Sequence, residues 1–265
     1  MLAAWMLAAL LADGCAARPS AGPSATSGSG VDASAHASLA EDAVTAAEPK
    51  PAAHAQGGNV ALDVPGYLPA VVWVPEGGAG AKPVVVATHG AYDNPESYCR
   101  FWQGIVKERA FVVCTRGLKI HETAFYYPEH FFIDRETSAA LAALRARFGA
   151  RVAEGPALYA GYSQGAIHGA PLLQLRPETH PRAILIEGGG AWTLAEATRY
   201  RKAGGERLLF VCGTAGCHKA ATRAVKILSD AGLDVQLIWL PTAGHDYPPP
   251  MAELIAERLE WLMAP

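Results

Sequence analysis

The stretch that decides the fold is Ala157-Leu158-Tyr159-Ala160-Gly161-Tyr162-Ser163-Gln164-Gly165. Its first four residues form an apolar run typical of a strand buried in a sheet, and residues 164–175 have the pattern of a helix. The Gly-x-Ser-x-Gly sequence between them predicts a sharp strand-to-helix turn that lifts the Ser163 hydroxyl above the sheet. The N–H of Gln164, at the start of that helix, is placed to stabilise negative charge. We therefore predict that Ser163 is a nucleophile and that Gln164 contributes to an oxyanion hole.

Outward from this turn, apolar strand patterns alternate with helical patterns in both directions. Such alternation predicts βαβ units, and hence a mostly parallel twisted sheet with helices on both faces. Residues 59–64 and 70–74, separated by Pro65-Gly66, predict an N-terminal antiparallel hairpin. We expect one α/β domain over residues 59–265, with its chemistry at the carboxyl ends of the strands. Further strands are expected at 84–87, 111–114, 183–186, 208–211 and 235–240, and helices at 95–108, 135–148, 191–203, 219–231 and 251–263.

Two segments precede this domain. Residues 2–11 are apolar and lead into Ala12-Asp13-Gly14-Cys15, which predicts a signal peptide over residues 1–15. The residues before Cys15 resemble the lipobox of bacterial lipoproteins, so Cys15 is a lipidation candidate and a possible membrane tether. An ordinary cleaved signal or an unstructured N-terminus is the alternative. Residues 16–58 contain 29 Ala, Ser, Gly or Pro among 43 and are expected to form a disordered tether.

Composition and charge narrow the classes of protein that this chain can belong to. Because 51% of the 265 residues are hydrophobic, global disorder is excluded. A net charge of −3 at pH 7 provides no basic surface for nucleic acid, so no nucleic-acid partner is expected. The histidines show no spacing that suggests a zinc site, and we expect neither a metal nor a cofactor.

The cysteines fit an exported protein that resides in the bacterial periplasm, on the outer membrane or outside the cell. Apart from Cys15, the chain has Cys99, Cys114, Cys212 and Cys217. Four cysteines allow three disulfide pairings. The expected strand positions favour Cys99–Cys114 and Cys212–Cys217, and four buried thiols are the alternative.

With these motifs the sequence resembles the α/β-hydrolase superfamily over residues 59–265, in particular its carboxylesterase and dienelactone-hydrolase-like branches without a large lid. The resemblance implies that His89-Gly90-Ala91 shapes the second half of the oxyanion hole, with the Ala91 N–H as a donor. It also implies a general-base histidine in the loop after the last strand. His245 follows residues 235–240 there, directly after Gly244. An imidazole with a pKa near 6.5 can take the serine proton and return it to the leaving group.

The acid that should orient His245 is missing from its usual place. Most relatives carry an Asp after the penultimate strand, but residues 212–218 contain no carboxylate. Glu187 ends the preceding strand at the same edge of the sheet, and the chain order Ser163, Glu187, His245 is that of the family. We therefore predict that Glu187 is the triad acid. The alternative is that Glu187 is a turn residue and that a backbone carbonyl, or no acid, holds His245.

An aromatic-rich connection over residues 116–132 follows a strand at the same edge. Tyr126 and Tyr127 within it, together with Tyr92 and Tyr162, are candidate residues of a substrate pocket. The alternative is that the aromatic residues pack this connection onto the domain.

These residues predict a serine hydrolase that cleaves carboxylic esters or thioesters, with a small-molecule or lipid-like ester as its substrate. Water would release the acyl group from Ser163. A lipase, a polyester depolymerase or a peptidase on the same scaffold is the alternative among enzymes. The alternative outside enzymes is a binding protein that has lost the triad acid.

Overall fold

The computed structural model describes residues 58–77 and 80–264. The predicted signal peptide with Cys15, and the predicted tether up to residue 57, lie outside these residues. Among the described helices, none combines the length and the apolar character needed to cross a membrane.

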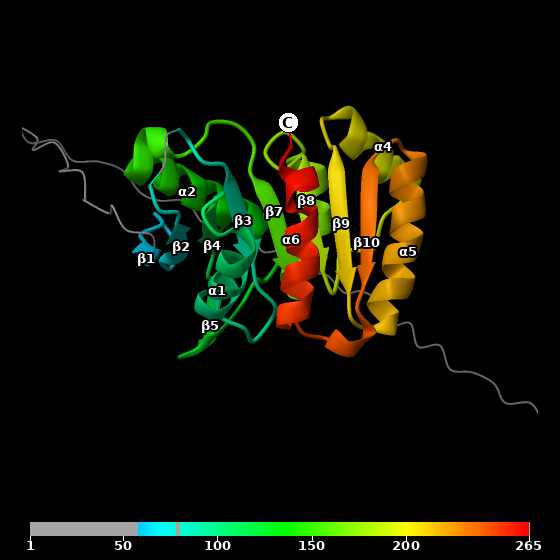
Figure 1. Ribbon diagram of the computed structural model, residues 1–265, viewed down its shortest axis with the longest axis horizontal. Coiled ribbons are helices and arrows are strands. Elements are labelled where there is room, and N and C mark those ends of the chain that lie inside the picture. Colours follow the sequence, from blue (N-terminus) through cyan, green and yellow to red (C-terminus); the bar gives the residue numbers. More distant parts are fainter. Residues whose placement is uncertain (1–57, 78–79, 265) are drawn as a thin grey trace, which may run out of the picture. The chain divides into compact units, whose positions relative to one another are not determined.

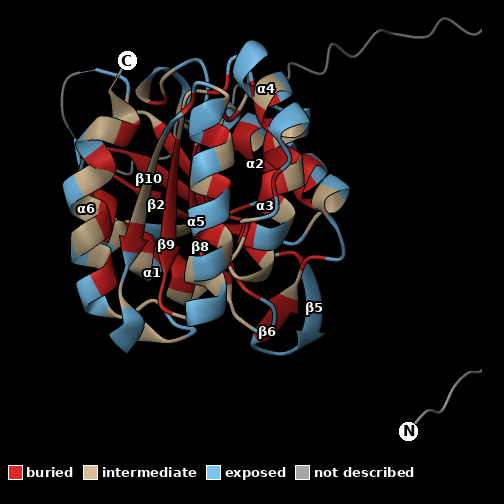
Figure 2. Ribbon diagram, turned by 90° about the vertical axis from the view of Figure 1, so that its right-hand side faces the viewer, coloured by how far each residue is buried: buried red, intermediate tan, exposed pale blue. Residues whose placement is uncertain are grey.

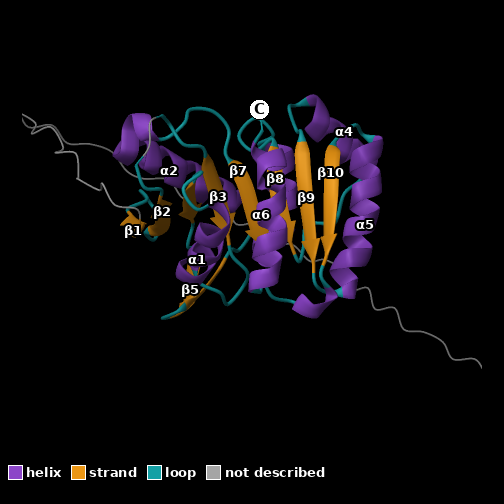
Figure 3. Ribbon diagram, in the orientation of Figure 1, coloured by secondary structure: helices purple, strands orange, loops and turns teal. Residues whose placement is uncertain are grey.

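A sheet of eight strands forms the centre of the domain (Figures 1 and 3). Its order is β1-β2-β4-β3-β7-β8-β9-β10. β2 is antiparallel to both of its neighbours, and every other pair is parallel, as the sequence predicts. The strands are β1 (Gly58–Leu62), β2 (Ala70–Val74), β3 (Val84–Thr88), β4 (Phe111–Cys114), β7 (Leu158–Tyr162), β8 (Arg182–Ile186), β9 (Arg207–Cys212) and β10 (Asp234–Trp239).

Successive residues of a strand point to opposite faces of the sheet. The buried strands carry apolar side chains on both faces, and helices cover both. In β7, Leu158 and Ala160 belong to one core cluster and Tyr159 to another. The first cluster lies beneath α1 (Pro95–Val106) and α6 (Pro249–Met263). Figure 2 shows the buried strands between α6 on one side and α5, α3 and α2 on the other. The second helical layer consists of α2 (His130–Phe148), α3 (Gln164–Leu175), α4 (Leu194–Lys202) and α5 (Ala215–Asp230).

α6 begins two residues before its predicted start, and two other helices begin a full turn or more earlier than the sequence patterns predict. α2 starts at His130 instead of residue 135, and its N-cap, Glu129, makes no side-chain cap hydrogen bond that would mark the start. α5 starts at Ala215 instead of residue 219, because the Thr214 side chain accepts a hydrogen bond from the N–H of Cys217. The connection before α2 is also more ordered than expected, since it contains a two-stranded ribbon of β5 (Leu118–His121) and β6 (Ala124–Tyr126).

Candidate active site

Ser163 lies at the turn between β7 and α3, in a backbone conformation that glycine usually occupies. It is the N-cap of α3 and has φ +48°, a strained value for a residue with a side chain. The flanking glycines make this turn possible. A Cβ atom on Gly161 would lie 2.7 Å from the Gly165 backbone, and one on Gly165 would collide with the carbonyl oxygen of Thr88. The turn is therefore held tightly against β3, with the serine at the carboxyl edge of the sheet.

A chain of hydrogen bonds runs from Ser163 through His245 to Glu187. The Ser163 hydroxyl lies 2.9 Å from Nε2 of His245, and Nδ1 of His245 lies 3.1 Å from Oε2 of Glu187. When Nδ1–H donates to the carboxylate, Nε2 is left as the acceptor for the serine proton. The structure thus brings together the three residues that the sequence singles out for catalysis, from the ends of three different strands.

Tyr162 supports His245 through the backbone. Its hydroxyl donates to the carbonyl oxygen of His245 over 2.9 Å. Burial raises the pKa of Tyr162 well above its usual value, so the phenol keeps the proton that it donates. Tyr162 is therefore a structural support of the loop after β10 and presents little of its surface to a substrate, since it is 7% exposed.

Glu187 is buried, and its carboxylate accepts hydrogen bonds from four groups of the described residues. Oε1 accepts the backbone N–H groups of Gly213 and, at 3.0 Å, Thr214. Oε2 accepts the Thr214 hydroxyl at 2.8 Å in addition to the imidazole of His245. A buried carboxylate is costly unless it is bonded in this way. Its backbone φ of +54° is a second strained value at this edge of the sheet.

The loop after β9, which has no carboxylate of its own, thus supplies three of the four donors to Glu187. Thr214 is a residue of the site that the sequence motifs do not single out. A threonine followed by a helix is an N-cap signal, which could have indicated that its hydroxyl and nearby N–H groups converge on one acceptor.

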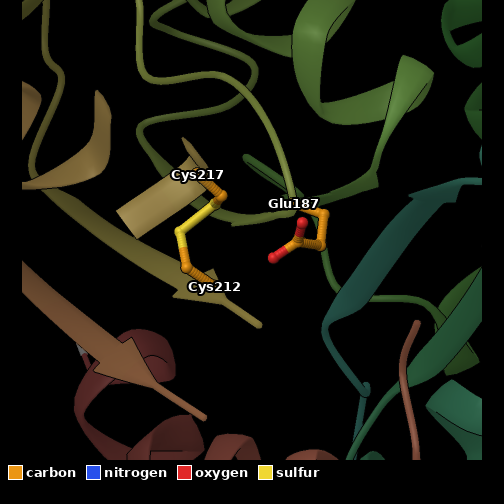
Figure 4. Close-up of side chains that lie close together, drawn as sticks. All are labelled: Glu187, Cys212 and Cys217. Carbon is orange, nitrogen blue, oxygen red and sulfur yellow. A yellow bond between two sulfur atoms is a disulfide. The ribbon is translucent and has the colours of Figure 1, made fainter. Parts of the chain in front are cut away.

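A disulfide closes this donor loop. Cys212 and Cys217 are joined across it, with Cα atoms 5.5 Å apart, and Figure 4 shows the bridge beside Glu187. The carboxylate and the two sulfur atoms are close enough to suggest a metal site. However, sulfur atoms joined in a disulfide offer no thiolate ligands, so this cluster does not fit a metal ion.

The second disulfide joins Cys99 of α1 to Cys114 at the end of β4, with Cα atoms 5.7 Å apart. The structure therefore has the pairing that the strand positions favour rather than four thiols. Disulfides are typical of proteins that fold in an oxidising environment.

The loop after β3 lies against the nucleophile. A Cβ atom on Gly90 would be 3.2 Å from the Cβ of Ser163 and 2.9 Å from the ring of Tyr162. Ala91 follows directly, and the N–H of Gln164 opens α3, so both predicted oxyanion donors belong to segments that meet at Ser163. Their joint action on a bound oxyanion stays a prediction.

His89 has a structural environment. Its ring is buried, with Nδ1 2.7 Å from the carbonyl oxygen of Gly90 and Nε2 3.0 Å from that of Arg116. Burial lowers the pKa of this imidazole, which favours its neutral form. His89 therefore supports the loop that carries Ala91.

The candidate pocket tyrosines have different environments. The Tyr92 side chain is 73% exposed, and its backbone N–H bonds the carbonyl oxygen of Phe125. Tyr126 is half-buried at the end of β6. Tyr127 is fully buried, its hydroxyl bonds Thr115, and its backbone N–H donates to the side chain of Gln164 over 2.8 Å. Tyr127 thus packs the aromatic connection onto the domain, and Tyr92 is the one of the four that exposes most of its ring.

Comparison with known proteins agrees with this architecture. The chain is similar to a ferulic acid esterase (TM-score 0.62, 13% identity, 78% of this chain and 98% of that chain). It is also similar to the fluorophosphonate-binding serine hydrolase F of Staphylococcus aureus (TM-score 0.56, 12% identity, 78% and 98%). It spans 61% of the length of an uncharacterized protein from Bacillus cereus, which covers 71% of this chain (TM-score 0.58, 16% identity). No family model and no curated protein sequence matches the chain.

At these identities the likeness establishes the fold. The order of the strands, the antiparallel hairpin at one side and the two helical layers are those of the α/β hydrolases. The chain therefore has the α/β-hydrolase fold.

Proposed function

We propose that this protein is a serine hydrolase that cleaves carboxylic esters or thioesters through an acyl-enzyme on Ser163. The observation that carries the proposal is the hydrogen-bonded sequence of Ser163, His245 and Glu187 at the carboxyl edge of the sheet. Similar structures include a ferulic acid esterase and a fluorophosphonate-binding serine hydrolase, which supports a hydrolase on this fold. The finer placement among carboxylesterases and dienelactone-hydrolase-like enzymes belongs to the same proposal.

In the first half of the reaction, His245 takes the proton of the Ser163 hydroxyl as the oxygen attacks the acyl carbon. Glu187 fixes Nδ1–H, so that Nε2 is the basic nitrogen, and stabilises the imidazolium that forms. The N–H groups of Gln164 and Ala91 donate to the tetrahedral oxyanion. His245 then returns the proton to the leaving alcohol or thiol.

In the second half, His245 takes a proton from the water that attacks the acyl carbon. It returns this proton to the Ser163 oxygen as the bond between that oxygen and the acyl carbon breaks, which releases the acid. A lipase, a polyester depolymerase or a peptidase would use the same steps. Activity against esters of increasing acyl length, an insoluble polyester and a peptide would separate these enzymes. The expected substrate is a small or lipid-like ester.

The test is covalent labelling of the full-length protein with a fluorophosphonate, which reacts with activated serine. We expect one adduct, located on Ser163 by mass spectrometry and absent from the His245→Ala variant. Hydrolysis of a short-chain 4-nitrophenyl ester should be lost in Ser163→Ala, while its circular dichroism spectrum stays unchanged. A folded protein that takes up no label would instead favour the non-catalytic binding protein.

The proposal places this enzyme outside the cytoplasm. The two disulfides and the apolar sequence before Cys15 support export. Lipidation at Cys15 would tether the enzyme to a membrane, and incorporation of a radiolabelled fatty acid that a Cys15→Ala variant loses would demonstrate this.

A further inference from the structure

A pocket of about 310 Å³ lies between α3, α5 and the loop after β8. The loop wall consists of residues 188–191, which follow Glu187 directly. A Cβ atom on Gly188 would lie 2.9 Å from the carbonyl oxygen of Ser163 and 3.1 Å from the side chain of Ile167. One lining residue, Gly188, thus packs against the backbone of Ser163, and the size of the pocket suits a small ligand or part of a larger one.

One cation lines this pocket without a partner. Arg223 of α5 is exposed and forms no ion pair or hydrogen bond with any described residue. No carboxylate is among the described residues that line the pocket. Lys219, one helical turn earlier, likewise has no partner in the described part of the chain. Because helical side chains lean toward the helix N-terminus, Arg223 leans toward the edge of the sheet that carries Ser163.

The loop wall adds unused backbone donors. Within residues 58–77 and 80–264, no acceptor bonds the N–H groups of Gly188, Gly189, Gly190 or Ala191. Gly189 is buried, and a buried N–H group rarely lacks an acceptor. Successive free N–H groups in a concave loop are a recurrent anion-binding feature. A free guanidinium and free N–H groups on two walls of one pocket indicate an anionic ligand.

We propose that this pocket binds a carboxylate of the substrate, so that the preferred esters carry a second, ionised acid group. The apolar side chains of Ile167, Ala170 and Pro171 line the same pocket and would contact a hydrocarbon spacer between the two groups. Arg223 is then a specificity-determining residue. This inference rests on the proposed esterase function, since it concerns the substrate of that reaction.

The test compares esters that differ only in the distant acid group. One pair places it in the acyl part, mono-4-nitrophenyl octanedioate against 4-nitrophenyl octanoate. The other places it in the alcohol part, the acetyl ester of 8-hydroxyoctanoate against octyl acetate. We expect the acid to raise kcat/KM at least tenfold in one pair, mainly through KM. Arg223→Gln should abolish this preference, and Arg223→Lys should keep part of it.

A matched control separates the pocket from the general charge of α5. Lys226 lies on the same helix but forms an ion pair with Asp230, and it is not among the lining residues. Lys226→Gln removes one positive charge and should leave the preference unchanged. The inference is wrong if neither pair shows a preference, or if Arg223→Gln retains it. In those cases the neutral esters would still report ester hydrolysis, so failure of the inference differs from failure of the proposed function.

A binding measurement decides the inference even if no ester is hydrolysed. Calorimetric titration of the Ser163→Ala protein with octanedioate should show binding that weakens at least tenfold in the Ser163→Ala/Arg223→Gln protein. Octanamide, which has the same chain length but carries no carboxylate, is the neutral control, and its affinity should not depend on Arg223. Equal affinities of the two variants for octanedioate would overturn the inference.

Discussion

At the scale of residues, Glu187 receives its hydrogen bonds from a part of the chain far away in sequence. The carboxylate comes from the end of β8, while the loop after β9 provides its hydrogen-bond donors. The carboxylate and its donors thus come from the ends of two neighbouring strands.

Glu187→Gln should lower kcat by several orders of magnitude. An amide cannot stabilise the imidazolium of His245 and favours the wrong tautomer, a change that costs roughly 10⁴-fold in a serine protease triad. The control is Asp246→Asn, because Asp246 adjoins His245 but, among the described residues, its side chain bonds only the N–H of Tyr247. Initial rates with a 4-nitrophenyl ester measure both. Comparable rates for the two variants would remove Glu187 from its role.

Thr214→Val should reduce kcat by roughly ten- to a hundredfold and leave KM nearly unchanged, because Glu187 loses one donor and His245 its fixed orientation. The same change removes the N-cap of α5 and should cost about 1 kcal/mol of the free energy of unfolding. Thr214→Ser keeps the hydroxyl and should restore both quantities. A loss of stability with an unchanged kcat would show that Thr214 acts only as a cap.

At the scale of elements, the turn between β7 and α3 depends on how closely α3 approaches β3. The end of β3 leaves no space for a side chain at Gly165 of α3, because a Cβ atom there would meet the backbone of Thr88.

Two glycine-to-alanine changes in helices should therefore have opposite effects. Gly165→Ala should lower the free energy of unfolding by about 1–3 kcal/mol, as overpacking does. Gly104→Ala in α1 should raise it by about 0.5–1 kcal/mol, because a Cβ atom there has open space and alanine is the better helix former. Urea denaturation of the two variants checks both signs, and a stabilised Gly165→Ala would contradict the tight turn.

The strands and helices were largely predictable from the sequence, because buried parallel strands are continuous apolar runs with regular spacing. The starts of α2 and α5 were harder to predict. Glu129 makes no side-chain cap hydrogen bond, and the N-cap Thr214 stands between glycines and cysteines in a sequence that is typical of a loop. At the site, Ser163 and His245 follow from local motifs. The donors to Glu187 lie far from it in the sequence and reach it because β8 and β9 are neighbours in the sheet. No local sequence motif marks such a contact.

At the scale of the whole molecule, a buried acid links stability to pH. Glu136 of α2 is buried, and its carboxylate accepts the backbone N–H groups of Arg116 and Gly117, just before β5. Burial outweighs these bonds and raises its pKa to about 7.

The wild-type protein should lose stability relative to Glu136→Gln as the pH rises from about 4.5 to 7. In this range the folded protein retains a proton on Glu136 that the unfolded chain has released, so the free energy of unfolding falls with pH. The difference should reach a few kcal/mol at most, since one pKa unit corresponds to about 1.4 kcal/mol. Urea denaturation of both proteins at several pH values measures it, and parallel curves would refute the assignment.

The division between Glu187 and its donor loop also has an evolutionary consequence. A lineage that carried carboxylates after both β8 and β9 would have a redundant acid, and either one could be lost without passing through an inactive ancestor. A sequence comparison that looks for an acid only after β9 would therefore overlook Glu187 in this chain.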